Sequence, residues 1–239
     1  MKHPAKALDK LRALERAYEL PAGSADKLLT ILVALESEES SVTTVRDPIA
    51  GADVHVADSL VALQVPELKA AKRIADLGAG GGFPGLALAV ALPGAHVTLV
   101  ESVGRKCDFM TRAAELAGVG NAEAVHARAE QWTEGLGSND VVVVRALAPL
   151  DVIAEYAAPL LELGGLLIAY KARRDREEET AGARAAGELG LSVRPVMPVA
   201  PYPGAGQRHL HLFTKTAPTP NRFPRRAGMA RKRPLGTAR

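Results

Sequence analysis

A glycine-rich segment constrains the fold of this chain more than any other feature. Residues 74–85 read IADLGAGGGFPG, an apolar run that reaches Asp76 and then enters a glycine cluster and a Leu/Ala/Val segment. This order predicts a strand, a tight turn and a helix. Glycines let the backbone approach a ligand closely, and a helix N-terminus presents unpaired N–H groups to it. Roughly twenty residues further, an apolar run ends in Glu101, where a carboxylate suits the two hydroxyls of a ribose. We therefore expect an adenosine-containing cofactor.

The spacing of the acid and the glycines selects among such cofactors. Dinucleotide sites carry G-x-G-x-x-G, whereas this chain has Asp76-x-Gly78-x-Gly80-x-Gly82, with the acid before the glycines. A carboxylate there would repel a pyrophosphate but suits a cationic cofactor. S-adenosylmethionine, which has an ammonium, a sulfonium and no phosphate, is favoured. A nicotinamide dinucleotide and a glycine turn without a ligand are the alternatives.

Length and composition fit one α/β domain with extensions. The chain has 239 residues, 47% of them hydrophobic, and a single cysteine, Cys107, so neither a disulfide framework nor a cysteine metal cluster is expected. No metal is expected at His209 and His211 either, since they alternate with apolar residues as in a packed strand. The charged first twenty residues and the lack of a membrane-length apolar window predict a cytoplasmic protein without a membrane partner. We expect a monomer.

Apolar runs alternate with helical patterns through the middle of the chain, which predicts a mostly parallel, Rossmann-like α/β sheet. The last two of seven expected strands are joined by a loop too short for a helical crossover, so one of them should run antiparallel. Ser24 is the expected N-cap of a second N-terminal helix. Three regions are expected: a helical extension packed on the core (1–65), a methyltransferase domain (66–216) and a basic tail (217–239). The expected strands are 73–77, 96–101, 122–127, 140–144, 165–170, 192–199 and 209–214; helices are expected within 4–39 and at 58–65, 83–91, 104–117, 150–161 and 173–189, and 43–56 is expected to be irregular.

The basic charge is concentrated in the tail. From Pro218 onward the chain has seven basic residues and no acidic one. The whole chain has a net charge of +3, so the part before Pro218 has a net charge of about −4. Such a segment is typical of proteins that bind a polyanion, and its prolines and Phe223 favour an extended arm along a nucleic-acid strand. The expected RNA-contacting residues are Arg46, Arg105, Lys106, Arg208, Arg222, Arg225, Arg226, Arg231, Lys232 and Arg233.

Several motifs together resemble one enzyme family. The chain has VTTVRD at 42–47, HVADSL at 55–60, the glycine loop continuing into Phe-Pro-Gly, LVES at 99–102, Arg145-Ala146, QRHL at 207–210 and FPRRAG at 223–228. This set resembles the glucose-inhibited-division B family, the RsmG guanine-N7 methyltransferases of small-subunit (16S) ribosomal RNA. The chain departs from the family's usual Asn-Leu-Thr at Ser41-Val42-Thr43 and from its Lys-Gly at Lys171-Ala172.

The resemblance implies a class I methyltransferase that uses S-adenosylmethionine and acts on 16S ribosomal RNA or the small subunit. It implies cofactor contacts at Gly78, Phe83, Ala129, Glu130 and Arg145, to which the pattern of residues adds Asp76, Gly80 and Glu101. Guanine N7 has a free lone pair, so no general base is expected. Asp58 and Arg145 are the candidate catalytic residues, and His55 is expected to be structural or a phosphate partner.

Three rival functions remain open on sequence grounds: a methyltransferase of small molecules, a non-enzymatic RNA-binding assembly factor and a dinucleotide oxidoreductase. If RNA is the substrate, deleting the chain from Pro218 is expected to abolish activity on RNA while leaving cofactor affinity intact.

Overall fold

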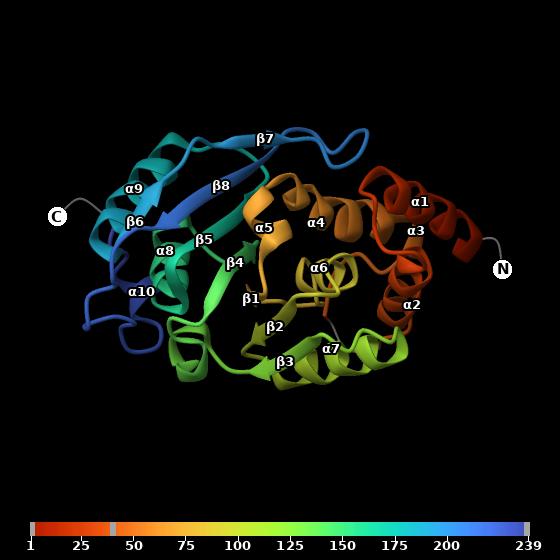
Figure 1. The fold of residues 1–239 in the computed structure, drawn as a ribbon, viewed down its shortest axis with the longest axis horizontal. Helices are drawn as coiled ribbons and strands as arrows, with labels where there is room; N and C mark the ends of the chain where they lie inside the picture. Colours follow the sequence, from red (N-terminus) through yellow and green to blue (C-terminus); the bar gives the residue numbers. More distant parts are fainter. Residues whose placement is uncertain (1–2, 39–41, 237–239) are drawn as a thin grey trace.

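A single mixed sheet forms the centre of the molecule in the computed structural model, which describes residues 3–38 and 42–236 (Figure 1). Its strand order is β3-β2-β1-β4-β5-β8-β6, and β7 also pairs with β8. The first five strands in this order are parallel, whereas β8 runs antiparallel to β5, β6 and β7. The strands are β1 (Arg73–Leu77), β2 (His96–Glu101), β3 (Ala122–His126), β4 (Asn139–Arg145), β5 (Leu161–Lys171), β6 (Leu191–Val193), β7 (Met197–Val199) and β8 (Arg208–Lys215).

The mostly parallel sheet and the antiparallel final strand are confirmed, but the expected count of seven strands is wrong. The segment expected as one strand, 192–199, is divided into β6 and β7, which pair with opposite ends of β8. Pro195 lies between them, and proline has no N–H to give to a ladder. The break therefore makes eight strands within the described residues.

Helices cover both faces of the sheet. Alternate residues of each central strand enter different cores, so that Ile74 packs with the N-terminal helices while Ala75 packs with α8 and α9. This burial on both faces explains why the strands are continuous apolar runs. No helix within the described residues is long and apolar enough to cross a membrane. The helices are α1 (His3–Ala17), α2 (Ser24–Ser37), α3 (Pro48–Gly51), α4 (Asp58–Leu60), α5 (Pro66–Ala70), α6 (Gly85–Ala91), α7 (Gly104–Leu116), α8 (Leu150–Ala157), α9 (Arg176–Leu189) and α10 (Met229–Lys232).

The segment expected to be irregular, 43–56, is largely helical. Asp47 accepts a hydrogen bond from Ala50 N at 2.9 Å and so caps α3, whose first residue is Pro48. The helix continues through a π-helical segment, η1 (Ala52–Ala57), into α4. The expected N-cap role of Ser24 is also wrong, because Ser24 is inside α2 and the carboxylate of Glu15 accepts from Ala25 N instead.

The basic tail is folded against the core rather than extended. The Phe223 side chain is only 8% exposed, and Ala230 on α10 is 3% exposed, both in the core formed with α8 and α9. The expectation of an extended arm is therefore wrong. The prolines and arginines suggested an open chain, but the Phe223 ring packs in the apolar core formed with α8 and α9.

Candidate cofactor and substrate site

The glycine loop lies between β1 and α6, as expected. Gly78 has φ +70° and its N–H donates to Val100 O at 2.8 Å, which holds the loop against β2. Gly80 has φ +59°, and a Cβ added there would meet only Gly78 O, at 3.8 Å. A side chain at Gly80 would therefore point into open space above the loop, which is where a ligand would approach the backbone.

Glu101 lies at the end of β2 with its carboxylate turned toward this loop. The residue is buried, and its two oxygens accept hydrogen bonds from Gly80 N and Val103 N, each at 3.0 Å. Ser102 Oγ also donates to Oε1, at 3.3 Å, so Oε2 is the oxygen that keeps a second lone pair. These contacts fix the orientation of Glu101 and leave acceptor capacity on Oε2 for a hydroxyl of a ribose.

Asp76 lies beneath the loop and does not line the cavity above it. Its Oδ2 accepts from Gly85 N at 2.8 Å, whereas its Oδ1 is buried without a partner among the described residues. Burial raises the pKa of Asp76 to about 7, against the lowering effect of the Gly85 hydrogen bond. Asp76 therefore supports the loop from below, and direct contact with a cofactor remains a prediction for this residue.

Two adjoining cavities open over the loop at the carboxyl ends of β1, β2 and β4. The glycine-loop cavity has a volume of about 530 Å³ and includes Phe83 and Arg145 in its wall. The Glu130 cavity, of about 260 Å³, includes Ala129 and Glu130. A larger hollow of about 680 Å³, between α7 and β3, lies away from the loop. Four residues line both adjoining cavities: Gly78, Ser102, Leu147 and Arg231.

The residues of these cavities fit S-adenosylmethionine. Open α/β sheets bind ligands outside the carboxyl ends of their strands, and this pair of cavities lies there. Glu101 supplies a buried acceptor in the larger cavity, and Ala129 and Glu130 follow β3 in the smaller one. The open backbone at Gly80 satisfies the need for close approach.

A third cavity, named here the Asp58 cavity, adjoins the glycine-loop cavity on its other side. Its volume is about 420 Å³, and it shares Thr43, His55, Arg145 and Ala146 with its neighbour. Arg145 donates from Nη1 to Asp58 Oδ2 at 2.8 Å and to Val54 O at 3.2 Å. Arg208 Nε lies 3.5 Å from the other oxygen of Asp58. One carboxylate thus binds two guanidinium groups at the junction of the cavities.

His55 forms part of the wall between the two cavities. Its ring stacks on Phe83, with ring centroids 5.0 Å apart and planes 15° apart, and its Nε2 lies 2.9 Å from Val45 O. A carbonyl only accepts, so Nε2 carries the proton. Burial lowers the pKa of His55. The imidazole is therefore neutral and held in place, in agreement with a structural role.

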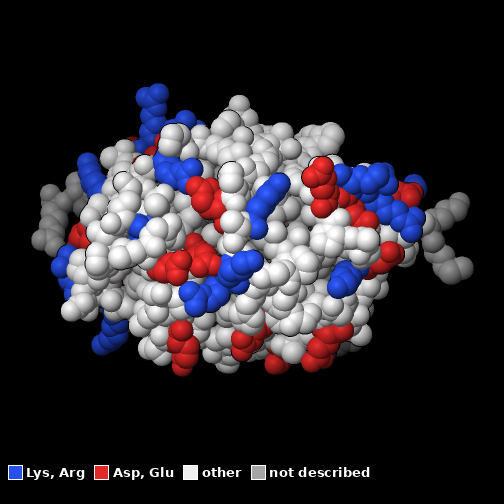
Figure 2. Space-filling view, in the orientation of Figure 1, with Lys and Arg blue, Asp and Glu red and all other residues white. Residues whose placement is uncertain are grey.

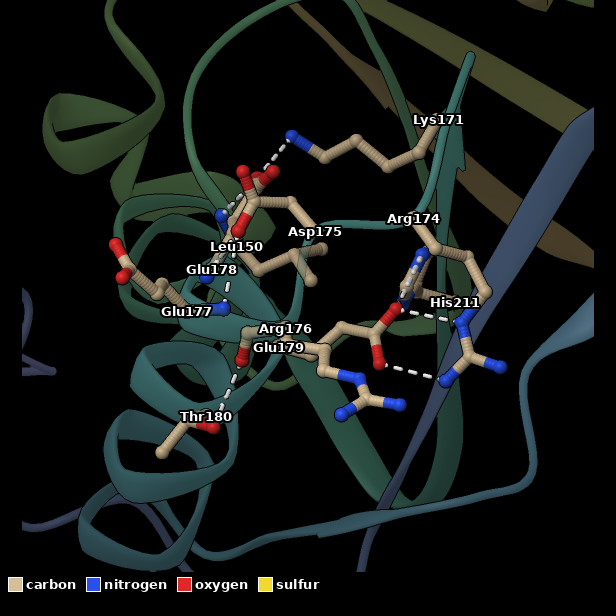
Figure 3. A network of polar contacts seen from close by, with 10 residues as sticks. All are labelled: Leu150, Lys171, Arg174, Asp175, Arg176, Glu177, Glu178, Glu179, Thr180 and His211. Carbon is tan, nitrogen blue, oxygen red and sulfur yellow. Dashed lines mark hydrogen bonds and ion pairs between the residues drawn. The ribbon is translucent and has the colours of Figure 1, made fainter.

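A network of ion pairs supports the far wall of the Asp58 cavity (Figure 3). Lys171, at the end of β5, pairs with Glu178 of α9 and donates to Ala148 O at 2.9 Å. Arg174 makes two hydrogen bonds with Glu179, at 2.8 and 2.7 Å. His211 Nε2 lies 4.0 Å from Glu179, and burial lowers the pKa of this histidine. The network fixes the loop after β5, where the family's usual Lys-Gly is Lys171-Ala172.

The residues expected to contact RNA are divided among several places. Lys106 and Arg231 line the glycine-loop cavity, and Arg208 lines the Asp58 cavity. Arg222 pairs with Glu188, and Arg225 pairs with Glu155, whose side chain is 2% exposed. The expected RNA contact of every one of these residues remains a prediction. Ser41, part of the family motif, lies outside the described residues. Arg46, Arg105, Arg226, Lys232 and Arg233 line none of the three cavities.

Several cavity residues were not predicted from the sequence to belong to the site. Ala146 has φ +55°, a left-handed conformation that costs energy for a residue with a side chain. It lines both the glycine-loop cavity and the Asp58 cavity. Its pairing with Arg145 in the family motif was the available signal. Tyr170 and His209 also line the Asp58 cavity, and the Tyr170 hydroxyl donates to Ser59 O at 2.9 Å. In the sequence, both residues lie in apolar strands and resemble ordinary core residues.

This fold and cofactor site define a class I S-adenosylmethionine-dependent methyltransferase. A family model described as "GidB: rRNA small subunit methyltransferase G" matches residues 25–200. The chain belongs to this family, as the motifs predicted. It is 39% identical over 202 residues to a protein named Ribosomal RNA small subunit methyltransferase G from Rubrobacter xylanophilus, covering 82% of this chain and 77% of that protein.

A further relative supports the family assignment, and solved methyltransferase structures share the fold. A protein of the same name from Deinococcus radiodurans is 39% identical over 207 residues, covering 85% of this chain and 78% of that protein. The crystal structure of a predicted O-methyltransferase from Agrobacterium tumefaciens has a TM-score of 0.52 and 25% identity, covering 68% of this chain and 80% of that one. A precorrin-6y C5,15-methyltransferase from Geobacter metallireducens, with a TM-score of 0.51 and 14% identity, covers 77% of this chain and 98% of that one and shares the fold.

Proposed function

We propose that this enzyme transfers a methyl group from S-adenosylmethionine to N7 of a guanine in 16S ribosomal RNA. Family membership supports the RNA substrate. The observation that carries the proposal is the Asp58 cavity, which adjoins the cofactor site and holds two guanidinium groups on its wall. A substrate bound there would lie next to the cofactor. The enzyme would work as a monomer in the cytoplasm, on the small subunit or its RNA.

The side chains around the cavity suit a nucleophile that needs no deprotonation. S-adenosylmethionine supplies a methyl group on a sulfonium, and guanine N7 has a free lone pair to receive it. His55 is neutral and its Nε2–H donates to Val45 O, while Asp58 accepts a hydrogen bond from Arg145. Neither group needs to act as a general base, so catalysis would come from holding the base in line with the methyl group.

The RNA must present its guanine outside a helix. N7 faces the major groove, which is deep and narrow in A-form RNA and closed to side chains. The target base would therefore lie in an irregular region or leave its stack to enter the Asp58 cavity. Arg208, at this cavity and half-buried, is suited to a phosphate of the flipped nucleotide, and Asp58 would offset the positive charge of the methylated base.

The test uses the cofactor carrying a labelled methyl group and small ribosomal subunits from cells that lack this activity. We expect one label per particle, at N7 of a single guanine, identified by mass spectrometry of the digested RNA. Arg208→Gln should lower kcat/KM for the particle about tenfold while leaving the Kd of the cofactor unchanged, because it removes a phosphate contact of about 1.4 kcal/mol. Arg194→Gln, whose side chain pairs with Glu67 outside these cavities, is the matched control.

The rival functions give different results in the same experiment. A small-molecule methyltransferase would bind the cofactor and leave the particle and its RNA unlabelled. An assembly factor without activity would bind the particle and transfer no methyl group. Label on a base atom other than guanine N7 would contradict the proposed position of transfer.

A further inference from the structure

The folded tail lies against the cofactor cavities as well as against the core. Arg231, on α10, lines both the glycine-loop cavity and the Glu130 cavity, and Gly228 lines the latter. These two residues come from a segment that ordinary methyltransferase motifs do not include. They lie 98 or more residues along the chain from Glu130 and the earlier cofactor motifs, so only the tertiary fold reveals the contact.

Two hydrogen bonds join the tail to the cavity walls. Gly228 N donates to Glu130 Oε1 at 2.9 Å, which fixes a carboxylate expected to face the cofactor. Arg231 Nη2 donates to Leu147 O at 2.9 Å. Leu147 itself lies over the glycine loop, since a Cβ added to Gly78 would meet its Cδ1 at 2.7 Å. The tail thus contacts walls of both cavities at their junction.

The segment is anchored firmly on each side of these contacts. Arg225 Nε donates to Glu155 Oε1 at 2.7 Å, and Arg225 Nη2 donates to Arg233 O at 2.8 Å. The Phe223 ring is buried, and the Arg222 guanidinium lies 4.9 Å above its centroid. After α10, Gly236 is buried against the backbone of α9. These anchors leave α10 little freedom to move away from the cavities.

We propose that the segment 218–236 is part of the cofactor site, with Arg231 as a cofactor-binding residue and Gly228 as a positioning residue for Glu130. A planar guanidinium can lie against an adenine ring or pair with a carboxylate, and Arg231 lines both cavities into which a cofactor would bind. The tail therefore serves cofactor binding in the absence of any RNA. This inference does not depend on the RNA substrate.

Calorimetric titration with S-adenosylhomocysteine tests the inference without a methyl acceptor. Arg231→Ala should raise the Kd about tenfold, because a charged contact to the ligand is lost. Lys232→Ala, which removes the same charge from the next residue of α10 and lines neither cavity, should leave the Kd within about twofold. The same rise in Kd for both variants would mean that the effect comes from net charge alone, and it would overturn the proposal.

A second variant tests the anchoring. Arg225→Gln breaks the ion pair with Glu155 without touching the cavities, and it should raise the Kd for S-adenosylhomocysteine while the far-UV and near-UV circular dichroism remain native. An unchanged Kd in folded Arg231→Ala and Arg225→Gln proteins would contradict the proposal. Deletion from Pro218 should likewise weaken cofactor binding, the reverse of what the sequence alone predicts.

Discussion

Asp76 shows how a single buried carboxyl group makes stability depend on pH. Its pKa is about 7 in the folded chain, against an ordinary value of 3.8, mainly because it is buried. Well below pH 3.8 the folded and unfolded chains both hold the proton. As the pH rises toward 7, the unfolded chain releases it and the folded chain does not, so stability is lost.

Asp76→Asn should therefore stabilise the protein increasingly between pH 4 and pH 8. Asparagine keeps an oxygen for Gly85 N and does not titrate, so the variant's advantage in free energy of unfolding should grow by roughly 2–4 kcal/mol over this range. Urea unfolding at a series of pH values measures it. Asp9→Asn, on an exposed part of α1, is the matched control for the loss of one carboxylate. A pH-independent difference for Asp76→Asn would contradict the assigned pKa.

Individual site residues were predictable where local sequence determines their position. Glu101 follows an apolar run at a fixed distance from the glycine loop, and the structure places its carboxylate on that loop. The neighbours of Arg145 were not predictable, because Val54 lies in a π-helical segment that the sequence pattern did not indicate, and Asp58 directly follows that segment. A hydrogen bond between Gly228 and Glu130 depends on tertiary packing alone.

Two ion pairs join the tail to the helices of the core, and they differ in how deeply the glutamate is buried. Glu155 of α8 is 2% exposed and pairs with Arg225, whereas Glu188 of α9 is 40% exposed and pairs with Arg222. Arg225→Gln leaves a buried carboxylate without its partner and should cost about 3 kcal/mol in free energy of unfolding. Arg222→Gln should cost less than about 1 kcal/mol, because water already screens that pair. Urea unfolding of both variants compares them, and equal costs would refute this division.

Elements were predictable in proportion to their burial. β1 and β2 have the bounds expected from the sequence, since each begins at one exposed residue, Arg73 or His96, and is buried from there to its end. The strand expected at 192–199 divides at Pro195, and its two parts pair with opposite ends of β8. The helix from Pro48 was missed although Asp47-Pro48 is a good start signal, because its first turn is followed by few periodic apolar residues.

The charges of the whole molecule are more mixed than the sequence suggested. Figure 2 shows basic and acidic side chains interleaved on one face, without a single continuous basic surface. Two tail arginines are paired with glutamates and one lines the cofactor cavities. Arg226, Lys232 and Arg233 are exposed and make no ion pair with any described residue. Among the described residues of the tail, these three are therefore available to phosphates.

Replacing Arg226, Lys232 and Arg233 together by alanine should therefore weaken RNA binding in a salt-dependent way. Each lost phosphate contact reduces counterion release, so the slope of log K against log salt concentration should fall by about 2 for a single-stranded region. The control replaces Lys6, Arg12 and Arg16, three exposed charges on α1, which lies at the other end of the molecule from α10 (Figure 1). Filter binding to small-subunit RNA across a salt series measures both slopes. The same reduction in both triple variants would mean that RNA responds to net charge, whereas a reduction confined to the tail variant would locate the phosphate contacts beside the cofactor site.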